Sequence, residues 1–315
     1  MLHLDVQALA LRLPRLALIN ALDDAFRADY QVPPRQHYPI GNTPEGTASL
    51  LIMPAWRAAG PADAGALGVK LVTVFPQNAA RNLSAVHASY TLFDALTGIP
   101  LATMDGSELT HRRTGAASAL AARYLADPQA SRLLMVGTGG LAPHVIESHA
   151  AIRPIREVRI WGRNVERACA LAATLGGAAY SVEVAEDLEA AVRWADIISC
   201  ATLATNPLVC GAWLRPGQHL DLIGSFTPEM READEEALLV SDIYVDTRAG
   251  ALAESGELVR AIATGAITSA DIRGELADLA RGTVAGRVNS RQITLFKSVG
   301  SGIEDLAAAQ LALAG

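Results

Sequence analysis

The stretch that decides the fold reads LLMVGTGGLA from Leu133 to Ala142 and is followed by EVRIWGRN from Glu157 to Asn164. Each begins with an apolar run typical of a buried strand, and a helix-length segment separates them, as in a dinucleotide-binding βαβ unit. Gly137 permits a tight turn, Gly139 lets the backbone approach a pyrophosphate, and the helix amino terminus favours the anion. We therefore expect a nicotinamide cofactor on Gly137, Thr138, Gly139, Gly140, Leu141 and Ala142, the alternative being a purely structural glycine turn.

The end of the second predicted strand indicates which dinucleotide is preferred. NAD sites usually offer an acidic side chain there to the ribose hydroxyls, whereas an arginine suits the 2′-phosphate of NADP. Here Arg163 and Asn164 follow the strand and Arg167 lies one turn further on. These residues favour NADPH, with NADH as the second option. The alternative is that both arginines are solvated charges at a helix start.

Composition restricts the class of protein. The 315 residues suffice for two domains, half of them are hydrophobic, and no run of about 18 uncharged apolar residues could span a bilayer. The net charge of −7 gives nucleic acid nothing to bind electrostatically. The three cysteines form no CxxC pair and no secretory leader is visible, so we expect a cytoplasmic protein. The scattered histidines predict no metal site.

Strand and helix patterns alternate from Arg132 to Asp246. The expected strands read RLLMVG, EVRIWG, SVEVA, ADIISCAT, HLDLIG and DIYVD. This alternation predicts a parallel sheet covered by helices on both faces. Ligands bind beyond the carboxyl ends of such strands, so Cys200, Ala201 and Thr202 and the segment from Gly224 to Thr227 are expected at the cofactor site.

The residues before about 113 have a different pattern. Strand-like runs at 49–53, 68–75 and 88–96 are separated by Pro, Gly and Asn turns, which indicates a second domain with one sheet. An alanine-rich helical pattern at 118–125 is suited to linking the two domains. A second helical pattern at 302–313 is expected to pack onto the amino-terminal half.

Three basic positions are candidates for chemistry. Lys70 lies in the apolar run GVKLVTVF, where a cation is costly to bury unless it is paired or faces a cleft. It is a candidate acid, base or polarising group, the alternative being a lysine on the solvent face of the sheet. Arg35 and either Arg112 or Arg113 could hold a substrate carboxylate through bidentate contacts, although single arginines are usually surface residues. The residues alone do not choose between Arg112 and Arg113.

A series of motifs, in order along nearly the whole chain, resembles the ornithine cyclodeaminase/mu-crystallin family. It comprises Met53-Pro54-Ala55, Lys70–Thr73, Leu92–Asp94, Thr97–Gly106, Leu109–Thr114, the glycine turn at Gly137, Asp196–Thr202, Phe296–Gly300 and Glu304-Asp305. The resemblance implies an α/β fold in which a doubly wound Rossmann sheet of residues 114–301 is inserted into an α+β substrate-binding and dimerisation domain of residues 1–113 plus 302–315. It also implies a homodimer and a site for an amino or imino acid.

The resemblance assigns roles to single residues. Lys70 matches the catalytic lysine of the family, Arg113 matches the carboxylate-binding arginine, and Arg35 matches a second arginine with less diagnostic flanking sequence. Thr114, which follows Arg113, joins the residues expected at the cofactor. No role is assigned to Lys297.

One position departs from the cyclodeaminase pattern. Ornithine cyclodeaminases carry an aspartate two residues before the proline of the loop after Gly224, and this chain has Phe226 before Pro228. A phenylalanine can neither attract an ammonium group nor accept a proton. The chain is therefore closer to the mu-crystallin and ketimine reductase branch.

That branch predicts an NAD(P)H-dependent reductase of cyclic ketimine carboxylates such as pyrroline-2-carboxylate or piperideine-2-carboxylate, with Phe226 at the substrate. The alternatives on this scaffold are cyclodeamination of ornithine and reductive amination of an oxo acid, as in the alanine dehydrogenases of the family. A protein that binds NADPH and a small molecule without catalysis is the alternative of another class.

Overall fold

The computed structural model describes residues 1–43, 46–60, 64–81, 83–177 and 179–315, which form two compact units. The first unit comprises Met1–Arg113 and Ser301–Gly315, and the second comprises Thr114–Gly300. The sequence places these boundaries at 113/114 and 301/302. No helix within the described ranges is both long enough and apolar enough to cross a membrane.

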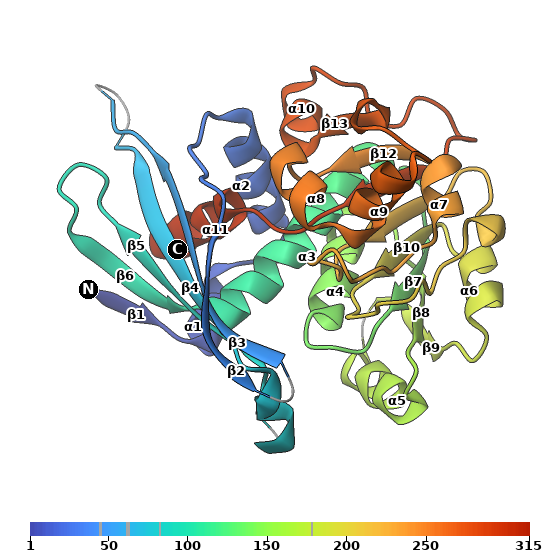
Figure 1. Ribbon diagram of the computed structural model, residues 1–315, viewed down its shortest axis with the longest axis horizontal. Helices are drawn as coiled ribbons and strands as arrows, with labels where there is room; N and C mark the ends of the chain where they lie inside the picture. The colour runs from blue at the N-terminus through green and yellow to red at the C-terminus, as the bar shows by residue number, and fades with distance from the viewer. Residues whose placement is uncertain (44–45, 61–63, 82, 178) are drawn as a thin grey trace. The chain divides into compact units, whose positions relative to one another are not determined.

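The second unit is built on a parallel eight-stranded sheet of order β13-β12-β14-β11-β10-β7-β8-β9 (Figure 1). The strand order reverses between β7 and β10, and ligands bind at such switch points. Its helices and strands are β7 (Arg132–Val136), α4 (Ala142–Ile152), β8 (Glu157–Trp161), α5 (Val165–Thr174), β9 (Ser181–Val184), α6 (Leu188–Trp194), β10 (Ile197–Cys200), β11 (His219–Leu222), α7 (Glu235–Leu239), β12 (Asp242–Val245), α8 (Arg248–Glu254), α9 (Gly256–Thr264), β13 (Ile272–Glu275), α10 (Leu276–Arg281) and β14 (Thr294–Lys297).

Both faces of this sheet are buried. Along β7, Leu133 and Met135 pack into one apolar cluster with α4, whereas Leu134 and Val136 pack into another with α6, α7 and α9. Successive side chains of a strand point to opposite faces, so helices must cover both sides. The predicted doubly wound Rossmann fold is confirmed. The six expected strands are present. Two further strands were not predicted: β13 lies at the edge of the sheet, and β14 lies between β11 and β12.

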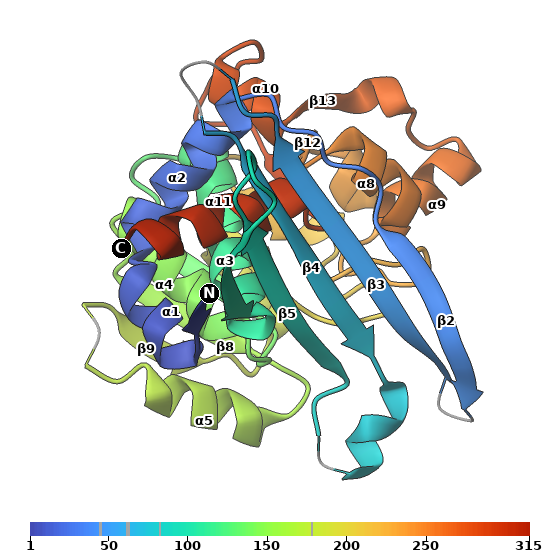
Figure 2. The same cartoon turned by 90° about the vertical axis from the view of Figure 1, so that its left-hand side faces the viewer.

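The first unit is an α+β unit with a six-stranded sheet of order β1-β6-β5-β4-β3-β2. Figure 2 shows its strands β5, β4, β3 and β2 side by side. Neighbouring strands are antiparallel except for β1 and β6, which are parallel. Its elements are β1 (Leu2–Leu4), α1 (Val6–Arg12), α2 (Arg15–Arg27), β2 (Gln36–Thr43), β3 (Gly46–Arg57), β4 (Ala66–Val74), β5 (Val86–Phe93), β6 (Pro100–Asp105), the start of α3 (Gly106–Leu125) and α11 (Gly302–Ala314).

Two helices position the candidate residues of the first unit. The helix α11 packs against α2, β3 and β4, and its first turn carries Glu304 and Asp305. The helix α3 begins at Gly106, twelve residues before the start that the pattern at 118–125 predicts. Leu109 is the only large apolar residue among residues 106–117, so this part of the helix has no apolar periodicity. The Oδ1 of Asp105 accepts a hydrogen bond from the backbone N–H of Glu108 at this end. The LTHRRT motif is consequently helical, and neighbouring side chains diverge by about 100° around the axis.

Candidate functional site

Lys70 is buried on the face of β4 that α11 covers. Its side chain is about 3 % exposed, and its Nζ lies 2.7 Å from Oδ2 of Asp305 and 3.5 Å from Oγ1 of Thr110. The next residue, Leu71, is 41 % exposed and lies on the opposite face of the strand. The structure therefore rules out the alternative in which Lys70 is a solvated surface lysine.

Arg113, rather than Arg112, joins Lys70. The Nε of Arg113 donates to Oδ1 of Asp305 at 3.0 Å and its Nη1 donates to Oε2 of Glu304 at 2.6 Å. Arg112 lies on a different side of α3, and its Nε lies 2.5 Å from Oε1 of Glu108, one turn earlier. Asp305 thus accepts contacts from both Lys70 and Arg113, whereas Arg112 pairs with Glu108.

Two arginines influence the protonation of Lys70. Burial lowers the pKa of Lys70 to about 8, Asp305 opposes this shift, and the positive charges of Arg113 and Arg35 add to it. Arg35 therefore lies near enough to act on Lys70 electrostatically. Lys70, Arg113 and Arg35 thus act on one another beside the carboxylates of Glu304 and Asp305. A lysine with a pKa near neutral pH can give up a proton under physiological conditions.

The rarity of lysine in this chain also distinguishes Lys70, and the motifs do not show this. The chain has 26 lysines and arginines, and only Lys70 and Lys297 among them are lysines. Both residues are buried, at 2 % and 0 % exposed over the whole residue. Lysine changes its pKa more readily than arginine when it is buried. Because all the remaining residues of these two types are arginines, the two lysines are candidates for a role that needs lysine.

The glycine turn of the second unit follows β7 at the switch point. Gly137 has a φ of +124°, and a Cβ there would lie 2.5 Å from the carbonyl oxygen of Ala201, which follows β10. A Cβ on Gly162 would lie 2.7 Å from the side chain of Thr138. The turns after β7, β8 and β10 therefore lie side by side. Within the turn, Gly139 and Gly140 are exposed, and Leu141 and Ala142 lead into α4.

The basic residues after β8 surround a helix start. The side chain of Asn164 accepts a hydrogen bond from the backbone N–H of Arg167 at 2.7 Å and so caps α5. The side chains of Arg163 and Arg167 are exposed. This geometry fits both a cofactor-binding role and the alternative in which the two arginines are solvated charges. The capping role of Asn164 was not predicted from the sequence.

Glu232 ties together the turns after β10 and β11. Its Oε1 accepts from the backbone N–H and the hydroxyl of Thr202 at 2.7 and 2.9 Å, and its Oε2 accepts from the N–H of Gly224 at 2.7 Å. Burial raises the pKa of Glu232 to about 7. The thiol of Cys200 lies in the apolar core, so only its backbone could face a ligand. Glu232 stands in an acidic run, and the sequence gives no sign of this role.

The loop that carries Phe226 is anchored by the second lysine. The Nζ of Lys297 donates to the carbonyl oxygen and the hydroxyl of Ser225, each at 2.7 Å, and lies 3.7 Å from Oε2 of Glu257. The next side chain, Phe226, is 38 % exposed. Lys297 therefore has a structural role in this loop. Thr114, also expected at the cofactor, is largely buried on α3.

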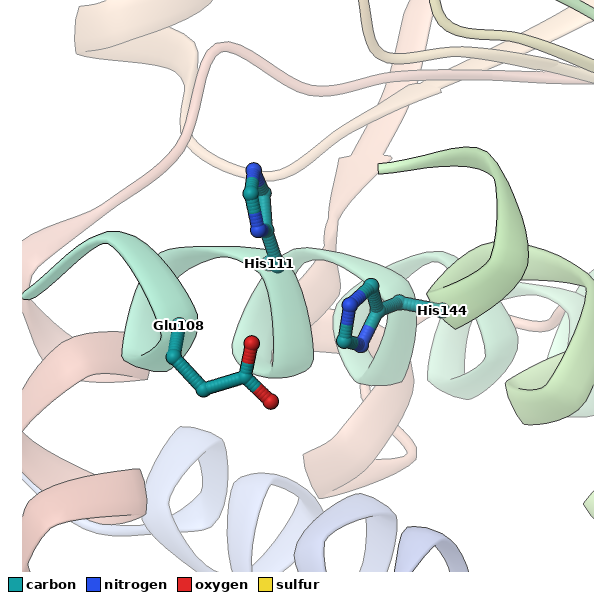
Figure 3. Close-up of side chains that lie close together, drawn as sticks. All are labelled: Glu108, His111 and His144. Atoms are coloured by element: carbon teal, nitrogen blue, oxygen red, sulfur yellow. The ribbon is translucent and has the colours of Figure 1, made fainter. Parts of the chain in front are cut away.

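Figure 3 shows three side chains that could ligate a metal, Glu108 and His111 from α3 and His144 from α4. The carboxylate of Glu108 already accepts a hydrogen bond from Nε of Arg112 at 2.5 Å. Burial lowers the pKa of His111. We do not assign a metal to these residues, because the guanidinium of Arg112 competes for the carboxylate.

Comparison with known proteins identifies the family. The model of the ornithine cyclodeaminase/mu-crystallin family matches residues 5–313. The chain belongs to this family. It is 46% identical over 284 residues to Protein SAR DEFICIENT 4 of Arabidopsis thaliana, covering 89% of this chain and 85% of the relative. It is 36% identical over 296 residues to the Delta(1)-pyrroline-2-carboxylate reductase of Colwellia psychrerythraea, covering 93% and 92%. The ketimine reductase mu-crystallin of Mus musculus is 37% identical over 262 residues, covering 83% and 79%.

Solved structures of this family have the same fold. The Delta(1)-pyrroline-2-carboxylate reductase of Thermococcus litoralis, in complex with NADH and L-proline, matches with a TM-score of 0.91 and 33% identity, covering 100% of this chain and 97% of that one. An archaeal alanine dehydrogenase dimer with bound NAD matches with a TM-score of 0.90 and 29% identity, covering 100% and 95%. The family membership expected from the motifs is confirmed.

Proposed function

We propose that this protein is an NAD(P)H-dependent reductase of cyclic ketimine carboxylates, which converts pyrroline-2-carboxylate or piperideine-2-carboxylate to proline or pipecolate. The observation that carries the proposal is the buried Lys70, with its pKa near 8, held beside Arg113 through Asp305. The reductases among the relatives and the proline bound in the Thermococcus protein support it. In this proposal the first unit binds the substrate and the second unit binds the cofactor.

The guanidinium group of Arg113 suits a substrate carboxylate. Arg113 uses Nε and Nη1 for its contacts with Asp305 and Glu304. Its Nη2 is the arm that would donate to a carboxylate oxygen, and Arg35 would donate to the other. An arginine held rigidly by two carboxylates orients the ligand, and correct orientation lowers the barrier by several kcal/mol.

Lys70 would supply the proton in the reduction. When bound, the nicotinamide supplies the hydride that forms the new C–H bond at the imine carbon. The C=N double bond becomes a single bond, and the nitrogen takes up a proton from the ammonium group of Lys70. Lys70 then regains a proton from solvent. Proton donation by a positioned side chain accelerates such reactions by about 10² to 10⁴.

The residues of the second unit fit a dinucleotide. The backbone at Gly139 and Gly140 is exposed beside the amino-terminal end of α4, where N–H groups and the helix dipole favour phosphate. We assign NADPH rather than NADH on the basis of Arg163, with Asn164 and Arg167 beside it. Both NADH and NAD+ occur in the related structures.

Arg163 provides a test of cofactor preference. We expect Arg163→Asp to weaken NADPH binding about tenfold or more, because a hydrogen bond to a charged group contributes about 1.5 to 3 kcal/mol. NADH binding should change much less. Titration of protein fluorescence with each cofactor measures both dissociation constants. Arg156→Asp is the matched control, because Arg156 is also exposed but precedes β8. Tighter binding of NADH than of NADPH by the unaltered protein would contradict the assignment.

Glu232 predicts a pH dependence of cofactor binding. The raised pKa means that the carboxylate takes up a proton as the pH falls through about 7, after which one oxygen no longer accepts from Thr202 or Gly224. We expect the affinity for NADH to decrease from pH 8 to pH 6. Glu232→Gln should bind NADH weakly at both pH values. NADH is the appropriate ligand because it lacks the 2′-phosphate, which would itself titrate near about pH 6. A variant with the affinity and pH dependence of the unaltered protein would show that Glu232 does not position these turns.

Phe226 favours reduction over cyclodeamination. Cyclodeamination must recruit a terminal ammonium group and remove its proton, which suits a carboxylate, whereas a half-exposed aromatic ring suits a flat cyclic ketimine. Reductive amination of an oxo acid is the second candidate, since an alanine dehydrogenase has a similar structure at 29% identity. A dependence on ammonia would identify that reaction.

We also propose that the protein is a homodimer. On the face of the first sheet opposite Lys70, Leu71 and Tyr38 are 41 % and 48 % exposed, and exposed apolar surface of this kind often marks an interface. The alanine dehydrogenase of similar structure is a dimer. Light scattering should give twice the chain mass of 33.0 kDa.

A cytoplasmic location is proposed from the free thiols of Cys169, Cys200 and Cys210.

A further inference from the structure

The carboxylate of Asp305 contacts both Lys70 and Arg113. Its Oδ2 lies 2.7 Å from Nζ of Lys70, and its Oδ1 accepts from Nε of Arg113 at 3.0 Å. The neighbouring carboxylate of Glu304 instead accepts from Nη1 of Arg113 at 2.6 Å. Lys70, Arg113 and Asp305 come from β4, α3 and α11, which lie far apart in the sequence.

We propose that Asp305 is a positioning residue that fixes the spacing between the proton donor Lys70 and the carboxylate anchor Arg113 and keeps Lys70 protonated. This inference rests on the proposed reductase function. In the reaction, the substrate carboxylate and the imine nitrogen are held at a fixed separation by the substrate itself. The two protein groups that meet them must therefore be held at a matching separation, and one rigid carboxylate on a buried helix turn provides it.

The charges around Lys70 make Asp305 necessary for its protonation. Arg113 on α3 and Arg35 before β2 both repel its ammonium group, and burial penalises its charge. Tyr90, its cross-strand partner on β5, is buried and has its pKa raised first by burial and then by Asp305, so it is neutral. Asp305 is the attractive partner in contact with Lys70. Removal of that charge should lower the pKa of Lys70, by about 1 to 3 pH units for an adjacent opposite charge.

Two carboxylates on the same helix turn give a matched pair of variants. Asp305→Asn removes the charge beside Lys70, whereas Glu304→Gln removes a charge beside Arg113. We expect the alkaline limb of the pH profile of kcat to move toward acid by at least about one unit in Asp305→Asn. In Glu304→Gln the limb should stay in place while KM for the ketimine rises. A purely structural role would lower kcat at every pH and leave the limb unmoved.

The small number of lysines allows a measurement that needs no substrate. Protein labelled with ¹³C at lysine Cε gives two signals, and Lys297→Arg identifies the signal of Lys70. We expect the Lys70 signal to titrate near pH 8 in the unaltered protein, at lower pH in Asp305→Asn and unchanged in Glu304→Gln. This titration holds even if the natural substrate is not a ketimine. Failure of the reductase assay alone therefore overturns the proposed function, and failure of the titration overturns the role of Asp305.

A variant that retains the charge covers the case in which Asp305→Asn does not fold. Asp305→Glu keeps the negative charge but moves it by one methylene group. We expect its alkaline limb to stay near that of the unaltered protein while kcat falls about tenfold or more, because the donor and the anchor are no longer correctly spaced. Unchanged kcat in Asp305→Glu, or an equal shift of the limb in Asp305→Asn and Glu304→Gln, would overturn the proposal.

Discussion

Replacing Lys70 by alanine is expected to lower kcat about a hundredfold or more and to leave the dissociation constant of NADPH nearly unchanged. The chemical step loses its proton donor, whereas the residues assigned to the cofactor all belong to other segments of the chain. Stopped-flow measurement of NADPH oxidation gives kcat, and fluorescence titration gives the dissociation constant.

Lys70→Arg separates charge from proton donation. It retains the positive charge beside Asp305, but a guanidinium group does not release its proton at neutral pH. We expect kcat in this variant to remain far below that of the unaltered protein. Recovery of most of the activity would show that Lys70 acts only as a positive charge, and undiminished turnover in Lys70→Ala would remove Lys70 from the mechanism.

Arg113 should have the second large effect, and its burial changes which variant is informative. Arg113→Ala would leave the carboxylates of Glu304 and Asp305 buried without this partner, and removal of one member of a buried ion pair costs about 3 to 5 kcal/mol. We therefore expect chemical denaturation to show that Arg113→Ala is strongly destabilised.

Arg113→Lys is the variant that tests substrate binding. It keeps a positive charge for the two carboxylates but lacks the forked donors that a ligand carboxylate would use. We expect KM for the ketimine to rise about 10- to 100-fold, since the lost contact contributes about 1.5 to 3 kcal/mol. Arg112→Lys is the control, because Arg112 pairs with Glu108 instead. A rise in KM of equal size in both variants would contradict the assignment of Arg113.

The parts of the fold that could be predicted are those that depend on local pattern. The strands β7, β8, β10, β11 and β12 are apolar runs between turns, and each stands where the sequence predicts it. The strand β14 was not predicted, because it lies beyond the region from Arg132 to Asp246 in which strand and helix patterns alternate. Only the long-range pairing of β14 with β11 and β12 gives it a place inside the sheet.

In the candidate site too, some residues could be predicted from the sequence and others could not. Lys70 stands out as a cation in an apolar run, and Arg113 is distinguished from Arg112 by the family motif. Glu304 and Asp305 belong to the family motifs, but their pairing with these cations could not be predicted, because they lie about 190 positions beyond Arg113. Glu232 is a comparable case, since its three hydrogen bonds reach turns that follow two different strands.

The measurement that tests the central claim most directly is NADPH oxidation with pyrroline-2-carboxylate and piperideine-2-carboxylate, with and without ammonia, beside ammonia release from ornithine plus NAD. The account predicts rapid oxidation with the cyclic ketimines, no requirement for ammonia, and no ammonia from ornithine. Release of ammonia from ornithine at a comparable rate would contradict the role given to Phe226. Oxidation that requires ammonia and an oxo acid would identify an amino acid dehydrogenase, and the absence of oxidation with any of these substrates would identify a binding protein.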